Sequence, residues 1–394
     1  MEQPGSESGL DSNRAAREAR IAARQKRDRA ITMSAAAALL LGLIIIGTVV
    51  MAKPGTNKKP TADTSSAAAT PSVSAGPQGS SAATQPTAAR SALAARATSA
   101  APASPRATAA PAAPVTRQSG AARTGAFSVR DARRYLGVLA GQIGVRPGGS
   151  ANEKAAADYI RAEVEAAGYS PAIESFKLPN GKTSQNVTAV LRGSTDRRIV
   201  LGAHYDTKKP APGANDNGTG SAALMAIAKK LADETLPYTV EFVWFGTEEM
   251  IDSNGDHHHY GSRFHVTSLT ASERARVDAM ISVDMIGYGP EFRVRTMNVG
   301  PQGLRKKLVS FAKAKGLPAA FMRDSSTYGF SDHEPFELAG LPAAWIEWRD
   351  DPTYHSADDV IGHIEWDKVN TTGQLVLDFL RSLGPSDLKA FHAS

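Results

Sequence analysis

Apolar and polar residues alternate along positions 127–394 with the periods expected of helices and strands. The helical period is clearest over 151–167, where one face carries Tyr159, Ile160, Val164 and Ala167. Ser150 and Glu153 form a capping-box signature at the start of this segment, and Gly168 follows its end. The pattern therefore predicts a helix over 151–167.

Short apolar runs and further helix-length segments fill the rest of this region. Strands are predicted at 187–191, 199–201, 240–245 and 280–283. Helices are predicted at 219–233, 302–315 and 366–382. The later strands are apolar at nearly every position, as expected for central strands covered on both faces. This alternation predicts an α/β fold with a mixed, mostly parallel sheet flanked by helices.

The N-terminal part of the chain has a different composition. Residues 1–30 form a basic, polar tail, which we expect to be cytoplasmic. Residues 31–52 carry no charge and are long enough to cross a bilayer, which takes about 20 apolar residues. The basic flank precedes this run, so the positive-inside rule places the rest of the chain outside. We therefore predict a transmembrane signal anchor at 31–52 and a single-pass protein of the cell membrane with an extracellular C-terminal domain.

A cleavable signal peptide is the alternative interpretation of 31–52, because Val50-Met51-Ala52 resembles a small-residue cleavage site. Signal h-regions are about 7–15 residues long, which is shorter than this run and favours the uncleaved anchor. Cleavage would make the protein a secreted one. Residues 53–126 are mostly Ala, Ser, Thr, Pro and Gly. They predict a disordered stalk, because they offer too few large apolar side chains to offset the entropy of ordering.

Charge and cysteine content narrow the chemistry of the domain at 127–394. The chain has a formal net charge of +6, but this domain contains 33 acidic and 30 basic residues. The basic excess therefore lies outside the domain, and we expect no nucleic-acid binding. The chain has no cysteine, so any metal must be held by His, Asp and Glu, which suits zinc and other divalent ions.

Three predicted strands lead into residues that can bind a metal. They run into His204, into the pair Glu248-Glu249 and into Asp284. In open α/β sheets, ligands bind beyond the carboxyl ends of the strands. A buried strand that leads into two carboxylates also favours a partner cation, because unpaired buried charge is costly.

Two further residues lie in loops. Asp216 lies in the turn-rich segment Gly213-Ala214-Asn215-Asp216-Asn217-Gly218, and His355 lies in Tyr354-His355-Ser356. Taken alone, each is more typical of a turn former, a helix cap or a hydrogen-bonded loop residue. The sequence pattern by itself supports two interpretations of the residues at these five places about equally well: that they bind a metal, and that they have only structural roles.

From about Phe127 to about Leu383, the chain resembles peptidase family M28, the zinc exopeptidases that include bacterial secreted aminopeptidases. The resemblance rests on motifs in the family's order and rough spacing: Gly202-Ala203-His204-Tyr205-Asp206, Gly213-Ala214-Asn215-Asp216-Asn217-Gly218-Thr219-Gly220, Gly246-Thr247-Glu248-Glu249, Val283-Asp284-Met285-Ile286-Gly287, Ser331-Asp332-His333 and Tyr354-His355-Ser356. It implies a zinc-exopeptidase (phosphorylase/hydrolase-like) fold for residues 127–394.

The resemblance also implies two zinc ions per chain, held by five ligands. His204 and Asp284 would bind one ion, and Glu249 and His355 would bind the other. Asp216 would bridge the two.

Three more residues receive catalytic roles from the same resemblance. Glu248 would be the general base for a metal-activated water, Asp206 would orient His204, and Tyr354 would help stabilise the tetrahedral intermediate. Carboxylates near the metals suit a substrate with a free α-ammonium group, which favours an aminopeptidase acting on peptides with a free N-terminus.

The chain departs from the family pattern after Glu249, where a longer and more polar segment precedes Gly261-Ser262. A solvated loop is the favoured interpretation of its three histidines, His257, His258 and His259. Shaping substrate access or binding an extra metal are the alternatives. Ser331-Asp332-His333 receives no definite role: helix capping before Glu334 and support of the metal site both fit.

Other activities remain open at this point. The same fold carries carboxypeptidases and glutaminyl cyclases, the latter with a single zinc. A one-metal site would not need both His204 and His355, which favours two metals. A non-catalytic ectodomain built on a decayed peptidase is less favoured, because all five ligand positions and the base are filled.

Overall fold

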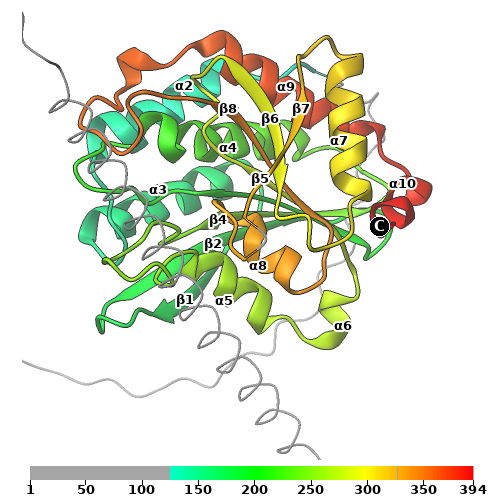
Figure 1. The fold of residues 1–394 in the computed structure, drawn as a ribbon, viewed down its shortest axis with the longest axis horizontal. Helices are drawn as coiled ribbons and strands as arrows, with labels where there is room; N and C mark the ends of the chain where they lie inside the picture. The colour runs from blue at the N-terminus through cyan, green and yellow to red at the C-terminus, as the bar shows by residue number, and fades with distance from the viewer. Residues whose placement is uncertain (1–124, 326, 394) are drawn as a thin grey trace, which may run out of the picture. The chain divides into compact units, whose positions relative to one another are not determined.

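The computed structural model describes residues 125–325 and 327–393. These residues form a single eight-stranded sheet with helices on both faces (Figure 1). The predicted tail, anchor and stalk, at 1–30, 31–52 and 53–126, lie outside the described residues except for 125 and 126. Among the helices in the described ranges, none has both the length and the apolar character needed to span a bilayer.

The sheet is mixed, with a parallel centre. In spatial order its strands are β1 (Ala172–Lys177), β2 (Thr183–Leu191), β4 (Thr239–Phe245), β3 (Arg198–His204), β5 (Val277–Val283), β8 (Ala343–Arg349), β6 (Glu291–Thr296) and β7 (Ala320–Arg323). Strands β4, β3, β5 and β8 run parallel to one another, and β2 and β6 flank them in the antiparallel direction. The carboxyl ends of the four central strands therefore meet at one edge of the sheet.

Helices cover both faces of this sheet. In chain order they are α2 (Val129–Leu136) with its π-helical continuation η1 (Gly137–Ile143), α3 (Ala151–Ala166), α4 (Gly220–Leu231), α5 (Tyr260–Ser268), α6 (Ala271–Arg274), α7 (Gly303–Ala314), α8 (His333–Leu338), α9 (Trp366–Ser382) and α10 (Pro385–Phe391). Two short irregular segments, η2 (Ala214–Thr219) and η3 (Ile361–His363), lie in loops. The order of strands and helices places α5 and α8 on the face opposite to α4.

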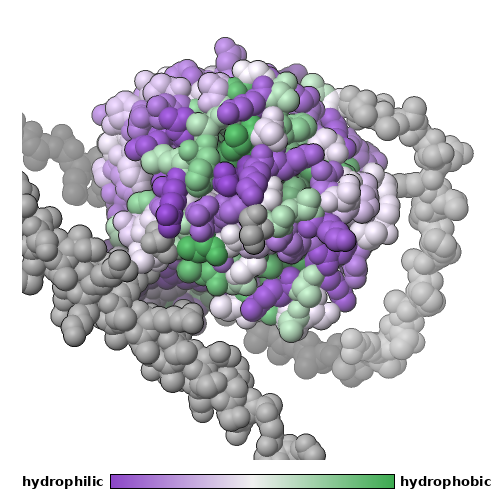
Figure 2. All heavy atoms as spheres, turned by 45° about the vertical axis from the view of Figure 1, so that its right-hand side comes forward, coloured by the Kyte–Doolittle hydropathy of each residue, from purple (hydrophilic) through white to green (hydrophobic). Residues whose placement is uncertain are grey.

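Successive side chains of the central strands point to opposite faces of the sheet, so each strand contributes to two hydrophobic cores, one on each face. On β4, Val240, Phe242 and Trp244 join the larger core beneath α2, α3, α4 and α9, while Val243 and Phe245 join the smaller core beneath α5 and α8. Because of this alternation, a strand buried on both sides is mostly apolar, and the charged exception on β4, Glu241, is paired with Arg198 at 2.7 Å. The view in Figure 2 shows an outer surface on which polar side chains predominate and apolar ones form small groups.

The structure confirms the predicted α/β fold and each helix and strand predicted within residues 127–394. The predicted helix at 151–167 is α3, whose N-cap is Ser150, with its hydroxyl accepting from the Glu153 N–H at 3.1 Å. The predicted capping box is incomplete, because the Glu153 carboxylate accepts from the Gly149 N–H at 2.6 Å rather than from that of Ser150. The other predicted helices and strands differ from the observed ones by a few residues at their ends.

Candidate metal centre and active site

Three adjacent strands bring their terminal residues to one place. His204 is the last residue of β3, Glu248 and Glu249 follow β4 by three and four residues, and Asp284 directly follows β5. Since β3 lies between β4 and β5 in parallel, these ends are neighbours. Glu248 and Glu249 lie on a turn rather than on an extended strand, because Thr247 before them has a φ of 51°.

The loop that carries Asp216 is fixed by a residue far along the chain. The Asp359 carboxylate accepts from the backbone N–H of Asn215 at 2.7 Å and from that of Asp216 at 3.1 Å. Asn217 anchors the other side of the loop, since its amide donates to the Val283 carbonyl at 2.9 Å. The loop is thereby tied both to the segment after His355 and to the end of β5.

Asp216 lies between the two histidines. Its Oδ1 is 3.2 Å from Nε2 of His204, and its Oδ2 is 3.1 Å from Nε2 of His355. On one side, Oδ1 of Asp284 lies 3.5 Å from Nε2 of His204. On the other side, Oε1 of Glu249 lies 2.7 Å from Nε2 of His355. All five predicted ligands therefore converge, and each carboxylate oxygen of Asp216 faces a different imidazole.

The electrostatics of this cluster fit a divalent cation. Burial and the neighbouring Asp216 raise the pKa of the Glu249 carboxyl to about 8. Burial also raises the pKa of Asp284, whose Oδ1 has no hydrogen-bond partner within the described part of the chain. Burying several carboxylates close together costs free energy unless a positive charge lies among them. His and carboxylate ligands together are a donor set that zinc takes.

Two of the predicted catalytic residues have contacts that sequence reasoning did not specify. Asp206 is fully buried, and its carboxylate accepts from the backbone N–H groups of Glu248 at 2.9 Å and Glu249 at 3.2 Å. Its distance to Nδ1 of His204 is 3.5 Å, longer than a hydrogen bond. Tyr354 is half exposed and stacks on the ring of His355, with 3.7 Å between the ring centroids.

Ser331 gives part of the unassigned Ser331-Asp332-His333 motif a structural role. Its hydroxyl donates to Oδ2 of Asp284 at 2.8 Å, so it supports a predicted ligand directly. Asp332 stands at the N-cap of α8 but makes no capping hydrogen bond with its side chain. The motif thus supports, through its serine, the set of five predicted ligands, which we call the metal cluster, and it does not cap a helix.

Arg146, which sequence reasoning missed, lies beneath the loops of the site. It is fully buried, and its guanidinium donates to five backbone carbonyls, those of Leu139, Gly144, Tyr205, Pro212 and Gly213, at 2.7–3.1 Å. The last three carbonyls belong to the segments that carry Asp206 and Asp216. A single arginine before a Pro-Gly-Gly turn offers no sequence signal that distinguishes it from a surface residue.

The expectation of a solvated histidine loop is wrong for two of its three histidines. His257 is partly exposed and pairs with Asp252 at 2.7 Å. His258 and His259 are buried, and Nε2 of His259 lies 2.8 Å from Oε1 of Glu248. The polar outer part of the loop is exposed as predicted, but its end folds back against the active site because α5 begins there.

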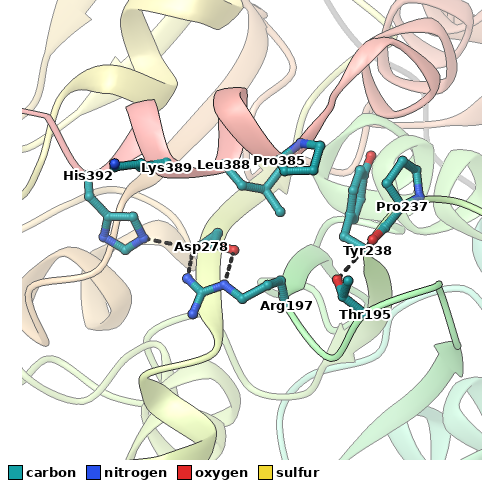
Figure 3. A pocket seen from close by; sticks show the side chains of 9 residues that line it. All are labelled: Thr195, Arg197, Pro237, Tyr238, Asp278, Pro385, Leu388, Lys389 and His392. Atoms are coloured by element: carbon teal, nitrogen blue, oxygen red, sulfur yellow. Dashed lines mark hydrogen bonds and ion pairs between the residues drawn. The ribbon is translucent and has the colours of Figure 1, made fainter.

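A separate pocket of about 440 Å³ lies at the opposite edge of the sheet (Figure 3). It opens where β3 and β5 begin, and α10 covers one side of it. Asp278 lies in it between Arg197 and His392, whose Nε2 is 2.9 Å from the carboxylate (Figure 3). The pocket shares no residue with the metal cluster, so we place the chemistry at the carboxyl edge.

Comparison with known proteins identifies the family. Residues 186–380 match the family model "Peptidase family M28". The chain carries a domain of peptidase family M28. The matched range of the M28 domain contains Glu248 and all five predicted ligands, which form the metal cluster described above.

Curated relatives of the M28 domain include several aminopeptidases. Leupeptin-inactivating enzyme 1 of Streptomyces exfoliatus is 29% identical over 212 residues, which are 53% of this chain and 46% of that protein. Aminopeptidase YwaD of Bacillus subtilis (strain 168) is 28% identical over 214 residues, 51% of this chain and 45% of that protein. The chain thus spans about half the length of these relatives.

Solved structures show the same fold. BSAP, a zinc aminopeptidase from Bacillus subtilis, aligns with a TM-score of 0.58 at 18% identity, covering 64% of this chain and 93% of that one. A glutaminyl cyclase from Porphyromonas gingivalis aligns with a TM-score of 0.57 at 23% identity, covering 64% and 98%. These likenesses establish the mixed α/β fold that the M28 domain shares with zinc aminopeptidases.

Proposed function

We propose that the M28 domain is a zinc-dependent aminopeptidase that removes N-terminal residues from peptides, with two zinc ions per chain. The position of Asp216 carries this proposal. One carboxylate whose two oxygens face two different imidazoles suits a bridge between two ions. His204 and Asp284 would complete one site, and Glu249 and His355 the other. The aminopeptidases among the relatives support the reaction class.

In this proposal, His204, Asp216, Glu249, Asp284 and His355 would hold the zinc ions, which would supply Lewis-acid polarisation of the scissile carbonyl and a lowered pKa for water. Glu248 is the general base, which takes a proton from the attacking water and passes it to the leaving amine. Asp206 holds the Glu248-Glu249 turn through two backbone N–H groups. The hydroxyl of Tyr354 stabilises negative charge that develops on the carbonyl oxygen. Carboxylates of the cluster attract the α-ammonium group of the substrate.

A panel of aminoacyl chromogenic substrates tests the activity. We expect the zinc-loaded chain to cleave free aminoacyl substrates and to leave N-blocked and C-terminal-residue controls intact. Chelation by phenanthroline should abolish this activity, and added zinc should restore it. Cleavage of the C-terminal-residue controls alone would replace the proposal with a carboxypeptidase.

The Glu248→Gln variant tests the base. It keeps the size of the side chain but cannot accept the proton, so we expect turnover to fall by at least about 100-fold. Zinc content should stay at two ions per chain. Glu165→Gln, an exposed change on α3, is the matched control and should keep wild-type rates. Wild-type turnover in a folded Glu248→Gln chain would refute the assignment.

Glutaminyl cyclases on the same fold make a one-metal enzyme the second candidate. Zinc content per active chain separates the two. A stoichiometry of one, together with cyclisation of an N-terminal glutaminyl peptide and no hydrolysis of aminoacyl substrates, would establish the cyclase instead. The convergence of His204 on Asp216 and Asp284 favours two ions.

We also propose that the domain lies outside the cell, anchored through residues 31–52. The support is the uncharged run at 31–52 and the basic residues before it. A reporter enzyme that folds only after export, fused after residue 126, should be active and should sediment with membranes. Activity in the culture medium alone would indicate a cleaved signal peptide, and a reporter active only in the cytoplasm would overturn the topology.

A further inference from the structure

The segment between Glu249 and α5 brings a histidine to the proposed general base. Its backbone is tied to the Glu248 turn, since the His259 N–H donates to the Glu248 carbonyl at 2.7 Å and the Tyr260 N–H donates to the Thr247 carbonyl at 2.9 Å. His259 itself has a φ of 53°, a left-handed conformation that is uncommon for a residue with a side chain. Such strain persists where surrounding contacts fix it, often at functional sites.

The imidazole of His259 contacts one oxygen of Glu248 and leaves the other free. Nε2 of His259 lies 2.8 Å from Oε1 of Glu248. The second oxygen, Oε2, lies 4.0 Å from Nε2 of His204 and so faces the metal cluster. A carboxylate held through one oxygen has a fixed rotamer, while its other oxygen remains available for a proton.

A buried carboxylate lies on the far side of the ring. Nδ1 of His259 lies 3.6 Å from Oε2 of Glu334. Glu334 is itself fixed, because its carboxylate accepts from Arg263 Nη2 at 3.0 Å and from the Gly329 N–H at 2.7 Å. Exposed fractions of 2% for His259 and 1% for Glu334 exclude bulk water from this contact. The ring therefore has little freedom to turn away from Glu248.

We infer that His259 is a positioning residue for the reaction: its Nε2–H donates to Oε1 of Glu248 and holds the carboxylate with Oε2 directed at the metal cluster. This inference rests on the proposed role of Glu248 as general base. In this role His259 keeps its proton throughout turnover and only holds the Glu248 carboxylate in place. The imidazole of His259 positions the Glu248 carboxylate, and the Glu334 carboxylate, itself bound by Arg263, positions that imidazole.

A third cation bound by His258, His259 and Glu334 is the competing interpretation of the same cluster. Arg263 argues against it. Its Nη2 lies 3.0 Å from Nε2 of His258 and 3.0 Å from Oε1 of Glu334, so a guanidinium already supplies the positive charge. Burial and the adjacent His259 lower the pKa of His258 to about 3, which makes it a neutral acceptor for that guanidinium. A metal ion beside Arg263 would meet electrostatic repulsion.

Three substitutions in the full-length, zinc-loaded chain test the inference. His259→Phe keeps a ring but removes the donor, and we expect kcat to fall by about 100-fold with KM changed less than about threefold, as for a misplaced catalytic group. His259→Gln restores a donor near the position of Nε2, and we expect it to recover kcat to within about tenfold of wild type. His257→Gln, a change in the partly exposed part of the same loop, is the control and should keep wild-type kinetics.

Readouts other than activity accompany these rates. Zinc content should be two ions per chain in wild type and in every variant, and circular dichroism should show a folded protein. A crystal structure of the zinc-loaded His259→Phe chain should show the Glu248 carboxylate in more than one rotamer. If the Phe variant does not fold, Glu334→Gln replaces it: removing the charge behind His259 should lower kcat by about tenfold without loss of zinc.

The outcomes separate the inference from the proposed function. Wild-type kcat in a folded His259→Phe chain would overturn the inference and leave the aminopeptidase assignment intact. Three zinc ions in wild type and two in the His259 variants would overturn it in favour of the third cation site. An equal loss in the Phe and Gln variants would show that a restored donor does not recover the rate, which also contradicts it. A wild-type chain that cleaves none of the aminoacyl substrates would instead defeat the proposed function.

Discussion

Replacing Arg146 with methionine should destabilise the domain although the residue touches no substrate. Arg146 is fully buried, and four of its N–H groups donate to five backbone carbonyls, three of which share Nη1. Methionine fills much of the same space but offers no donor. The five carbonyls would then lose a partner, three of them in fully buried contacts.

The expected size of the effect follows from two opposing contributions. A hydrogen bond contributes about 1 kcal/mol net, so the four N–H groups that donate give about 4 kcal/mol. Burying the guanidinium costs free energy, as shown by the burial that lowers the pKa of Arg146 to about 10. Methionine removes that cost. We therefore expect the free energy of unfolding to fall by about 2–4 kcal/mol.

Urea unfolding, followed through the four tryptophans, measures this difference. Arg134→Met is the matched control, because Arg134 also makes a bidentate contact, with Glu163 at 2.6 and 2.8 Å, but on the surface. Its loss should cost less than about 1 kcal/mol. Zinc affinity should fall only in the Arg146 variant, since two of the lost contacts hold the segment before Asp216. Equal stability losses in the two variants would refute the reasoning.

Three further changes have definite expected outcomes. Asp359→Asn removes one of the two acceptors that hold the Asp216 loop, so zinc affinity measured by calorimetry should fall by about 10–100-fold; an unchanged affinity would contradict this role. Burial raises the pKa of Glu153 to about 7 from 4.5, so the folded state binds the proton more tightly, and the free energy of unfolding should fall as pH rises from 4.5 to 7. Glu153→Gln should flatten that decline in urea titrations at several pH values, and an unchanged slope would disprove the cause. Gly220→Ala should cost at least about 2 kcal/mol of unfolding free energy, because the added Cβ would lie 2.0 Å from a buried carbonyl, whereas Gly137→Ala in open space should be neutral or stabilising by about 0.5–1 kcal/mol.

Much of the fold and the positions of His204, Glu249 and Asp284 could be predicted from local signals, whereas Asp216 and His355 were assigned through the family resemblance. A strand buried on both faces is mostly apolar, so β3, β4 and β5 stand out, and the residues at or after their ends lie at one edge by topology alone. His204 and Asp284 are examples. Strand β8 was not predicted, although it lies at the centre of the sheet. Its apolar run before Glu347 is only four residues long and begins with two alanines, which have low strand propensity.

The contacts that fix the site could not be predicted, because they join residues far apart in the chain. The Asp359 carboxylate accepts from the backbone N–H of Asn215, 144 positions earlier. The Ser331 hydroxyl donates to the Asp284 carboxylate, 47 positions earlier. An aspartate and a serine in polar loops have the same local sequence context whether they contact water or a distant ligand. Only the folded arrangement distinguishes the two cases.

The loop after Glu249 shows why polar composition misleads next to a catalytic centre. Polar segments are exposed on average because buried polar groups need partners. Near the site, however, charged partners are abundant, and a histidine at the end of a polar loop can be buried there because a carboxylate lies on each side of its ring, as Glu248 and Glu334 do for His259. A general base has conflicting needs: its carboxylate must be held still, yet one oxygen must stay free to accept a proton. A single donor on Oε1 satisfies both, which is the arrangement that His259 makes with Glu248.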